Sequence, residues 1–296
     1  MTDSAPVRPG LILLDKPSGL TSHDCVKEVR RLCPRRTKVG HGGTLDPFST
    51  GLLMVLVGKA TRLASFFQGM DKVYEGLFRF GASTDTFDRD GQVVEEGPLP
   101  DWSRIDLREL EASFVGPQMQ VPPSFSAKRI KKQRAYELAR MGEDVVLEPV
   151  PIEIYSFKLE RNSEDSLRFS LRCSSGTYVR SIARDAGVKI GSPCHCVELI
   201  RRTVGPFSLE SANGISEPFA EKGFIPFDRI DLAIPPVRVD FREERLVLNG
   251  QDVIAPRDLP IDSKWVKLVS PREAFLGIGR VEGRAIHPHV VFHEQS

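Results

Sequence analysis

The sequence predicts an α+β protein with a large N-terminal domain over residues 1–230 and a small all-β domain over residues 231–296. Up to about residue 230, apolar residues alternate as in strands in some segments and follow helical spacing in others. Pro226, Pro235 and Pro236 then bracket a linker, and short strand-like segments dominate after it. A chain of 296 residues is long enough for one large and one small domain.

The first elements are predicted to be a strand over residues 11–14 and a helix after a short turn. Thr21 or Ser22 caps this helix, whose apolar residues fall at helical spacing, and Pro34 ends it. The same two periodicities predict the elements that follow. These are strands over residues 52–57, 74–80, 150–160 and 167–173 and helices over residues 59–67 and 105–114.

A turn at residues 174–176 leads into the last element of the large domain. Thr177 is a candidate cap for a helix that runs to about Lys189. Tyr178 and Arg180 therefore lie where a strand passes into a helix, and side chains at such junctions commonly face a cleft. In the small domain, strands are predicted over residues 245–248, 265–269, 274–280 and 285–292.

Composition places the chain among cytoplasmic globular proteins. It is 40% hydrophobic and 27% charged, with no apolar run of membrane-spanning length and no secretory signal at the N-terminus. Its five cysteines are widely spaced and form no Cys-x-x-Cys pair, which argues against a disulfide framework. Adjacent side chains in Cys194-His195-Cys196 cannot easily all face one tetrahedral centre, and the histidines of the C-terminal tail fit an exposed strand face better than a metal site, so no metal is predicted.

The most informative segment is residues 40–47, Gly-His-Gly-Gly-Thr-Leu-Asp-Pro. Three glycines in four positions permit a tight loop that a ligand can approach closely. Pro47 disfavours helix at Asp46, and the buried strand 52–57 follows. An acid held between a stiff loop and a buried strand is placed for chemistry, although an isolated Asp-Pro is more often only a turn.

Several segments in a fixed order resemble the tRNA pseudouridine synthase B (TruB) family, of the bacterial stand-alone type. The loop with Asp46 resembles that family's catalytic loop, and residues 10–22 resemble its opening motif. The other similar segments are Asp71–Tyr74, Thr84–Asp88, Pro122–Lys128, Ser175–Arg180 and Leu199–Arg202. The C-terminal resemblance is weaker, although residues 275–281 resemble the end of a PUA-type RNA-binding barrel.

The resemblance implies a pseudouridine-synthase catalytic domain with a mixed, mainly antiparallel sheet, an RNA-binding insertion at about residues 120–150 and a PUA-like RNA-binding domain. It also implies isomerisation of uridine in RNA without a cofactor. Asp46 matches the family's nucleophile, and Arg180 matches the arginine that pairs with it. All of these catalytic positions precede residue 203.

The resemblance further implies a pocket for an extruded base. Tyr74 matches the residue that stacks on that base, Tyr178 matches another pocket residue, and Ile200 stands where the family usually has leucine. His41 matches the histidine that fills the space left by the base. Two further positions bear on this pocket. Asp88 matches an acid with a structural or pocket-ordering role, and Gly42 replaces a small hydroxyl residue common in the family.

A basic run precedes the second half of the large domain. Residues 128–140 hold six basic residues and one acid, a local charge of +5 in a chain whose net charge is only +1. Such a run with nearby aromatic residues suits binding of RNA phosphates, although alone it would fit a solvated helix face. The residues expected to bind RNA are Lys128, Arg129, Lys131 and Lys132.

The predicted function is therefore modification of the T-loop uridine at tRNA position 55, with tRNA as partner and no obligatory protein partner. Three alternatives stay open. A guide-RNA-dependent relative shares the loop motif, but this chain lacks long terminal extensions and a lysine-rich tail. A non-catalytic RNA-binding or RNA-folding role would tolerate loss of Asp46, and a glycosidase would want a second carboxylate in a comparable loop.

Replacing Lys128, Arg129, Lys131 and Lys132 with glutamine should weaken tRNA binding and flatten its salt dependence. The slope should fall by about one for each RNA phosphate that the variant no longer neutralises. Binding measured across a salt series checks this, and an unchanged slope would show that the run is only a solvated face.

Overall fold

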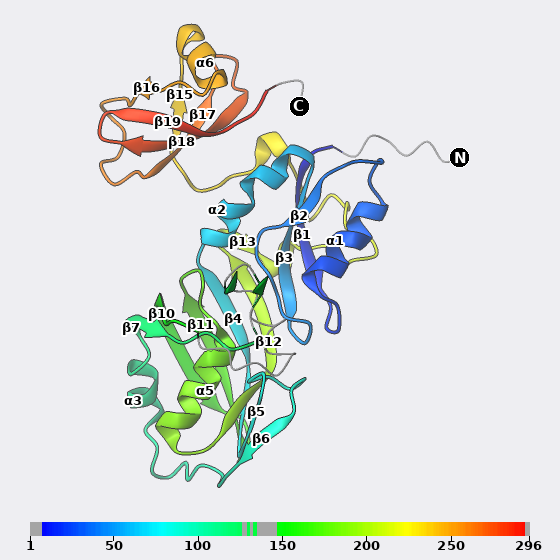
Figure 1. Cartoon of the computed structure of the whole chain (residues 1–296), viewed down its shortest axis with the longest axis vertical. Helices are drawn as coiled ribbons and strands as arrows, with labels where there is room; N and C mark the ends of the chain where they lie inside the picture. Colours follow the sequence, from blue (N-terminus) through cyan, green and yellow to red (C-terminus); the bar gives the residue numbers. More distant parts are fainter. Residues whose placement is uncertain (1–7, 126–128, 131–132, 135–146, 294–296) are drawn as a thin grey trace.

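The structure, a computed structural model, describes residues 8–125, 129–130, 133–134 and 147–293. A ten-stranded sheet forms the centre of the N-terminal part, and a five-stranded sheet forms the C-terminal part (Figure 1). In the described chain, no helix is long and apolar enough to span a membrane.

The large sheet is mixed and mainly antiparallel, as the sequence predicts. Its order is β14-β1-β3-β12-β4-β11-β10-β7, with β13 paired to β12 and β2 to β3. The pair β12–β3 is parallel, whereas the other neighbours in this sheet are antiparallel. Its strands are β1 (Gly10–Lys16), β2 (Val39–His41), β3 (Thr50–Val57), β4 (Lys72–Phe80), β7 (Gly116–Gln120), β10 (Val150–Arg161), β11 (Ser166–Cys173), β12 (Cys194–Val204), β13 (Phe207–Ser208) and β14 (Phe224–Pro226).

Helices border this sheet: α1 packs beside β2, and α5 packs against β12. The helices are α1 (Ser22–Arg31), α2 (Ala64–Gly69), α3 (Leu107–Ala112) and α5 (Val179–Ile190), and the short 3-10 helices are η1 (Gly58–Leu63), η2 (Leu209–Ser211) and η3 (Phe227–Arg229). Two small hairpins complete the part, β5 (Ala82–Thr84) with β6 (Val93–Glu96) and β8 (Arg129–Ile130) with β9 (Gln133–Arg134).

The predicted strands and helices of the N-terminal part are present, with differences at their ends. Thr21 caps α1 in a capping box with Asp24. The predicted helix 59–67 is instead the 3-10 turn η1 followed by α2. The helix predicted over 105–114 is shorter, because the Asp106 side chain accepts the first free backbone N–H groups and starts α3 at Leu107.

The cap predicted for α5 is wrong. Tyr178 is the N-cap residue, and it makes no side-chain capping hydrogen bond. The Thr177 hydroxyl instead donates to the carbonyl of Ser174, at 3.0 Å, and so closes the preceding turn. This places Arg180 in the first turn of α5, at the strand-to-helix junction expected for it.

The C-terminal sheet has the order β15-β17-β18-β19-β16, and one helix accompanies it. Its elements are β15 (Pro236–Arg238), α6 (Phe241–Leu248), β16 (Val253–Ile254), β17 (Trp265–Val269), β18 (Phe275–Glu282) and β19 (Ala285–Val291). The strand predicted over 245–248 is wrong, since these residues end α6. Asp240 and Glu243 form a capping box that starts this helix, and their spacing is visible in the sequence.

An aromatic cluster joins the two sheets. The ring of Phe227 stacks on Phe275, with centroids 5.2 Å apart, and meets Phe292 edge-on at 4.6 Å. The ring of Phe66 packs edge-on against Trp265 at 5.1 Å. The first three rings belong to one buried cluster that also includes residues of β1, β3 and η1, and Phe66 and Trp265 pack against it. The C-terminal sheet therefore shares apolar packing with the large one, and the domain boundary at residue 230 stays a prediction.

Phe227→Ala should lower the free energy of unfolding by about 3 kcal/mol, because truncating a buried phenylalanine leaves a cavity. The exposed Phe241, 64% accessible against 6% for Phe227, provides a matched control. Phe241→Ala should change stability by no more than about 0.5 kcal/mol. Chemical denaturation of both variants measures this, and equal small losses would show that the cluster contributes little.

Candidate active site

The loop that carries Asp46 is pinned on both sides by hydrogen bonds. Before it, the Ser22 hydroxyl accepts from the N–H of Leu45 at 2.8 Å and donates to the carbonyl of the same residue at 3.1 Å. After it, the Ser49 hydroxyl donates to the Asp46 carbonyl at 2.7 Å. The aspartate is thus held by the start of α1 on one side and by its own turn on the other.

Lys16 of β1 also holds this loop. Its side chain is fully buried, and Nζ donates to the carbonyls of Pro17, Leu20 and Pro47, at 2.9, 2.7 and 3.3 Å. Burial lowers the pKa of Lys16. An ammonium group at this place ties the turn after β1 to the residue that follows Asp46.

Arg201 of β12 holds the other end of the loop. This arginine is 1% exposed, and its guanidinium donates to the carbonyls of Leu52, Thr44 and Gly43 at 2.8, 3.2 and 3.2 Å. The planar fork of donors suits several backbone acceptors at once. The glycine-rich loop is therefore fixed to β12 through a buried cation.

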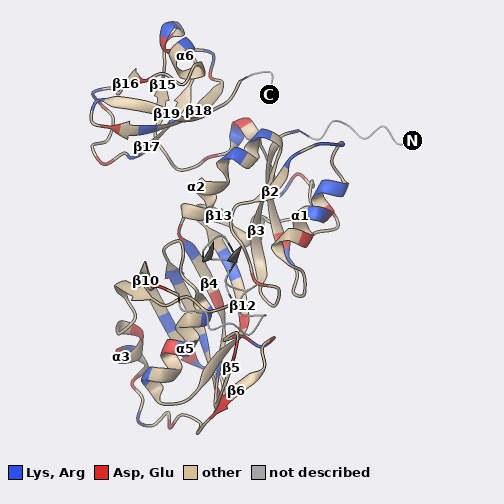
Figure 2. Ribbon diagram, viewed as in Figure 1, with Lys and Arg blue, Asp and Glu red and all other residues tan. Residues whose placement is uncertain are grey.

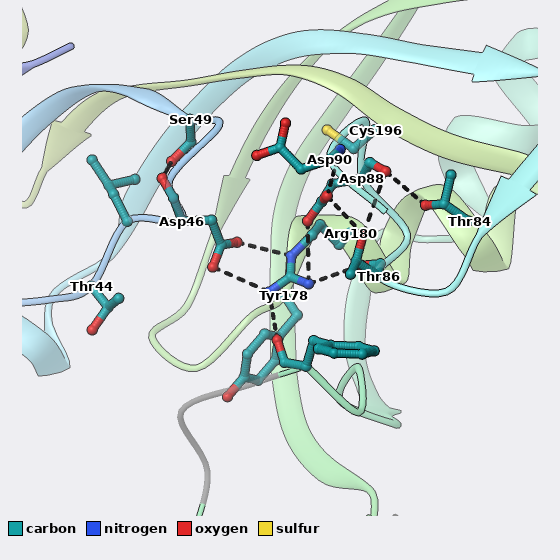
Figure 3. Close-up of polar contacts among 12 residues, drawn as sticks. Thr44, Asp46, Ser49, Thr84, Thr86, Asp88, Asp90, Tyr178, Arg180 and Cys196 are labelled. Atoms are coloured by element: carbon teal, nitrogen blue, oxygen red, sulfur yellow. Dashed lines mark hydrogen bonds and ion pairs between the residues drawn. The ribbon is translucent and has the colours of Figure 1, made fainter. Parts of the chain in front are cut away.

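The Asp46 carboxylate faces the guanidinium of Arg180 (Figure 3). Nε of Arg180 lies 2.8 Å from one carboxylate oxygen and Nη2 lies 3.1 Å from the other, a two-point ion pair. The Arg180 side chain is 5% exposed, whereas the Asp46 side chain is 33% exposed. The pair therefore presents its carboxylate, and not its cation, to solvent.

Arg180 is itself fixed by partners on its other side. It donates to the carbonyls of Thr86 and Phe125, at 2.8 and 3.0 Å, and lies 3.5 Å from the carboxylate of Asp88. Figure 3 shows Asp46 and Asp88 on opposite sides of the guanidinium. Burial raises the pKa of Asp88, and the charge of Arg180 opposes that rise.

The side chain of Asp88 has further hydrogen bonds that hold it toward Arg180. Its Oδ1 accepts from the Thr86 hydroxyl at 2.7 Å and from the N–H of Asp90 at 3.0 Å. These contacts agree with the pocket-ordering role expected for this acid, which stays a proposal.

A cleft of about 240 Å³ opens in front of Asp46. Of the side chains predicted for the site, Asp46, Tyr74, Tyr178 and Arg180 all line it. They come from the loop after β2, from β4 and from the start of α5. The cleft is also lined by Thr44, Leu45, Gln68, Lys72, Ser174, Thr177, Val179, Leu199 and Arg201, with Gly43 and Gly176.

The two tyrosines are held differently. Tyr74 is buried in the sheet face with Phe78 and Phe80, and burial raises its pKa. The backbone of Tyr178 is fixed by the Gln120 side chain, which accepts from its N–H at 2.8 Å and donates to its carbonyl at 3.1 Å. The cleft is thus lined by the Asp46 carboxylate and by two aromatic side chains, Tyr74 from β4 and Tyr178 from the start of α5.

Comparison with known proteins decides the family. A model described as TruB family pseudouridylate synthase, N-terminal domain, matches residues 30–179, and one described as pseudouridine synthase II TruB, C-terminal, matches residues 235–292. This chain belongs to the TruB family of pseudouridine synthases. It is accordingly an isomerase, and its C-terminal sheet is consistent with a PUA-like domain.

Relatives match the chain over almost its whole length. It is 38% identical to the tRNA pseudouridine synthase B of Caldanaerobacter subterraneus subsp. tengcongensis, over 96% of this chain and 99% of that one. It is 40% identical to the protein of the same name from Aquifex aeolicus, over 94% and 98%.

Solved structures share the fold at low identity. A chain from the crystal structure of a Cbf5-Nop10-Gar1 complex superposes with a TM-score of 0.71 and 21% identity, covering 99% of this chain and 91% of that one. A chain from an H/ACA RNP bound to a substrate RNA containing 2′-deoxyuridine gives 0.69 and 22%, covering 97% and 86%. This likeness shows that the chain shares its α+β fold with these two chains.

The structure does not bring Ile200 to the cleft. Along β12 its neighbours Leu199 and Arg201 line the cleft, and alternation along a strand directs Ile200 to the other face of the sheet. Leu199 is the apolar residue of the segment Leu199–Arg202 that lines the cleft. The role expected of Ile200 stays a prediction.

His41 lies at the end of β2 and is not among the residues that line the cleft. Its Nδ1 is buried without a hydrogen-bond partner, and burial lowers its pKa. The neighbouring Gly42 is required by packing, because a Cβ atom there would lie 2.6 Å from the Cβ of Phe67. The hydroxyl residue common in the family would not fit against this phenylalanine.

Most of the basic run predicted to bind RNA lies outside the described residues. Lys128, Lys131 and Lys132 belong there, and Arg129 is described only as a backbone position in β8. Among the described residues, no group of three or more His, Cys, Asp or Glu side chains is placed to hold a metal ion.

Arg201→Lys should lower both stability and turnover, although it keeps the charge. A lysine cannot supply the guanidinium's fork, so buried loop carbonyls lose donors at a cost of about 2 kcal/mol. Arg202, its exposed neighbour, forms only a surface ion pair with Glu75. Arg202→Lys should therefore stay within about 0.5 kcal/mol, and a similar loss in both variants would contradict a role of Arg201 in holding the loop.

Proposed function

We propose that this enzyme isomerises the T-loop uridine at position 55 of tRNA to pseudouridine, with Asp46 as the reacting carboxylate. Its family and its relatives' name, tRNA pseudouridine synthase B, support pseudouridine formation in tRNA. The observation that supports the role of Asp46 most is its ion pair with Arg180 at the edge of a cleft lined by Tyr74 and Tyr178.

The reaction rearranges one nucleotide without gain or loss of atoms. The bond between C1′ and N1 breaks, the uracil turns, and C5 bonds to C1′ while the hydrogen at C5 leaves as a proton and N1 gains one. The site needs an anion beside the nucleotide and walls that keep the detached uracil in place. Asp46 supplies the anion, held in orientation by Arg180, and the two tyrosines with Leu199 supply the walls.

The arrangement of carboxylates favours this reaction over glycoside hydrolysis. A glycosidase places two carboxyl groups on either side of the bond that it cleaves. Here the second carboxylate, Asp88, is buried behind Arg180 and is not among the cleft-lining residues. One accessible carboxylate facing a cleft with aromatic walls suits an intramolecular rearrangement.

We further propose that the enzyme acts on the T stem-loop of tRNA and that it needs neither a guide RNA nor a protein partner. We place this activity in the cytoplasm, where its substrate is found. Activity of the pure protein on a bare tRNA transcript tests this directly. No turnover without added RNA or protein would favour a guide-dependent enzyme, and binding without turnover would favour an RNA-folding role.

Asp46→Asn should lower turnover by about a thousandfold or more, because the amide keeps the shape and loses the anion. Affinity for tRNA should stay within a few-fold. Release of tritium from C5-labelled uridine in tRNA measures turnover, and a transcript with cytidine at position 55 shows which position reacts. Pseudouridine formed at another position would contradict the proposed substrate site.

Asp90→Asn is the matched control. Asp90 lies close to the site in Figure 3, but its side chain is 56% exposed and its carboxylate faces away from Arg180. Its turnover should stay within a few-fold of the unaltered enzyme. Thermal denaturation of both variants separates lost chemistry from lost folding, and near-normal turnover by Asp46→Asn would disprove the role given to Asp46.

A further inference from the structure

Positive charge is concentrated in a second segment that precedes the catalytic loop. Residues 24–38 hold six basic residues and two acids, a local charge of +4. Together with the basic run at 128–140, which carries +5, this leaves −8 on the rest of a chain whose net charge is +1. Such separation of charge is the electrostatic pattern of a protein that binds nucleic acid.

The two acids of this segment form ion pairs within it, whereas the cations at its C-terminal end form none with any described residue. Asp24 pairs with Lys27 at 3.1 Å, and Glu28 pairs with Arg31. Within the described part of the chain, no ion pair involves Arg35, Arg36 or Lys38, and all three are exposed. These three, with Arg30 and Arg31, are named here the 30–38 patch; in Figure 2, blue segments mark α1 and the loop after it.

The surface between these cations is concave. Arg30, Arg31, Arg35 and Arg36 border an open hollow of about 790 Å³ with the backbone of the turn at Pro34. The Arg30 guanidinium donates to the Val39 carbonyl at 3.1 Å and so joins the end of α1 to β2. Guanidinium groups around a hollow can donate hydrogen bonds to one phosphate from several sides.

The backbone does not explain these residues. Cations in the last turn of α1 are favoured by the helix dipole, which accounts for Arg30 and Arg31 but not for residues beyond the helix. Arg36 has a φ of +72°, a left-handed conformation that is unfavourable for a residue with a Cβ and that glycine adopts freely. An arginine is present where local structure favours glycine, so its side chain needs another reason.

The patch also lies on the segment that positions the catalytic loop. The residues before it include Ser22, which holds Leu45, and the residues after it form β2, which leads to the Gly42–Asp46 loop. The patch is thus joined on both sides to segments that hold the catalytic loop.

We propose that the 30–38 patch binds the phosphate backbone of the substrate tRNA, outside the nucleotide that enters the cleft. This inference rests on the proposed function, since it takes tRNA as the ligand. RNA is favoured over an anionic membrane because the cations surround a hollow instead of lying on a flat apolar face. The patch adds affinity and orientation and does not touch the reacting atoms.

The test compares two triple variants of the full-length protein with the same change of charge. In the first, Arg35, Arg36 and Lys38 are replaced by glutamine. In the control, glutamine replaces Arg104, Arg108 and Arg161, which are exposed near α3 and the end of β10. The affinity for unmodified tRNA transcript is measured across a salt series, and kcat and KM are measured by tritium release.

For the patch variant, the slope of log affinity against log salt should fall by about one for each RNA phosphate that is no longer neutralised. KM should rise about threefold or more while kcat is unchanged, and the control should match the unaltered enzyme in all three quantities. Equal slopes and KM values in the two variants would overturn the proposal. So would loss of binding to anionic vesicles with an unchanged tRNA slope, which would indicate a membrane surface.

Arg36→Gly separates function from folding. It relieves the left-handed strain, so thermal stability should be equal or higher, while tRNA affinity at low salt should still fall. Unchanged affinity in this variant would count against the proposal. Binding is measured apart from turnover, so patch-dependent binding of tRNA without modification at position 55 would reject the proposed function and leave the patch standing.

Discussion

The buried guanidinium of Arg180 is the interaction on which the rest of the site depends. Placing a cation in the interior is unfavourable unless its charge and all of its donors are satisfied. Here two carboxylates and two backbone carbonyls do so, and together with the arginine they come from four separate segments of the chain. The need to satisfy one cation thus brings the Asp46 loop, the turn after β5, the segment around Phe125 and α5 to one point.

Two other buried cations are satisfied in a similar way, but by backbone carbonyls only. Lys16 and Arg201 are directed at carbonyls of the loop that flanks Asp46, so the loop is held by charge-assisted bonds at both ends. Backbone carbonyls accept hydrogen bonds but carry no net charge, so they do not neutralise either cation. The carboxylate therefore lies in a region of positive potential that the fold itself maintains, which favours an anion there before substrate arrives.

The sequence predicts most of the architecture, because its strands and helices have clear periodicities and the motifs of the family occur in order. It fails where a residue's role depends on distant partners. Nothing in the sequence indicates that Arg201 rather than Arg202 is buried, or that Leu199 rather than Ile200 faces the cleft, because that depends on the register of β12. The helix α6 was missed for a local reason: Leu246, Val247 and Leu248 are consecutive apolar residues, which resemble a strand, although its capping box was present.

The contact between Gly42 and Phe67 has a consequence for how this family can diverge. A side chain at position 42 is excluded as long as α2 holds the Cβ of residue 67 beside it, where the Phe67 ring also packs against Phe207. Because every residue except glycine has a Cβ, a smaller side chain at 67 does not make room. A lineage can regain a hydroxyl residue at 42 only if α2 moves away from the loop or position 67 becomes glycine. The backbone of a neighbouring helix thus restricts how the loop beside Asp46 can change.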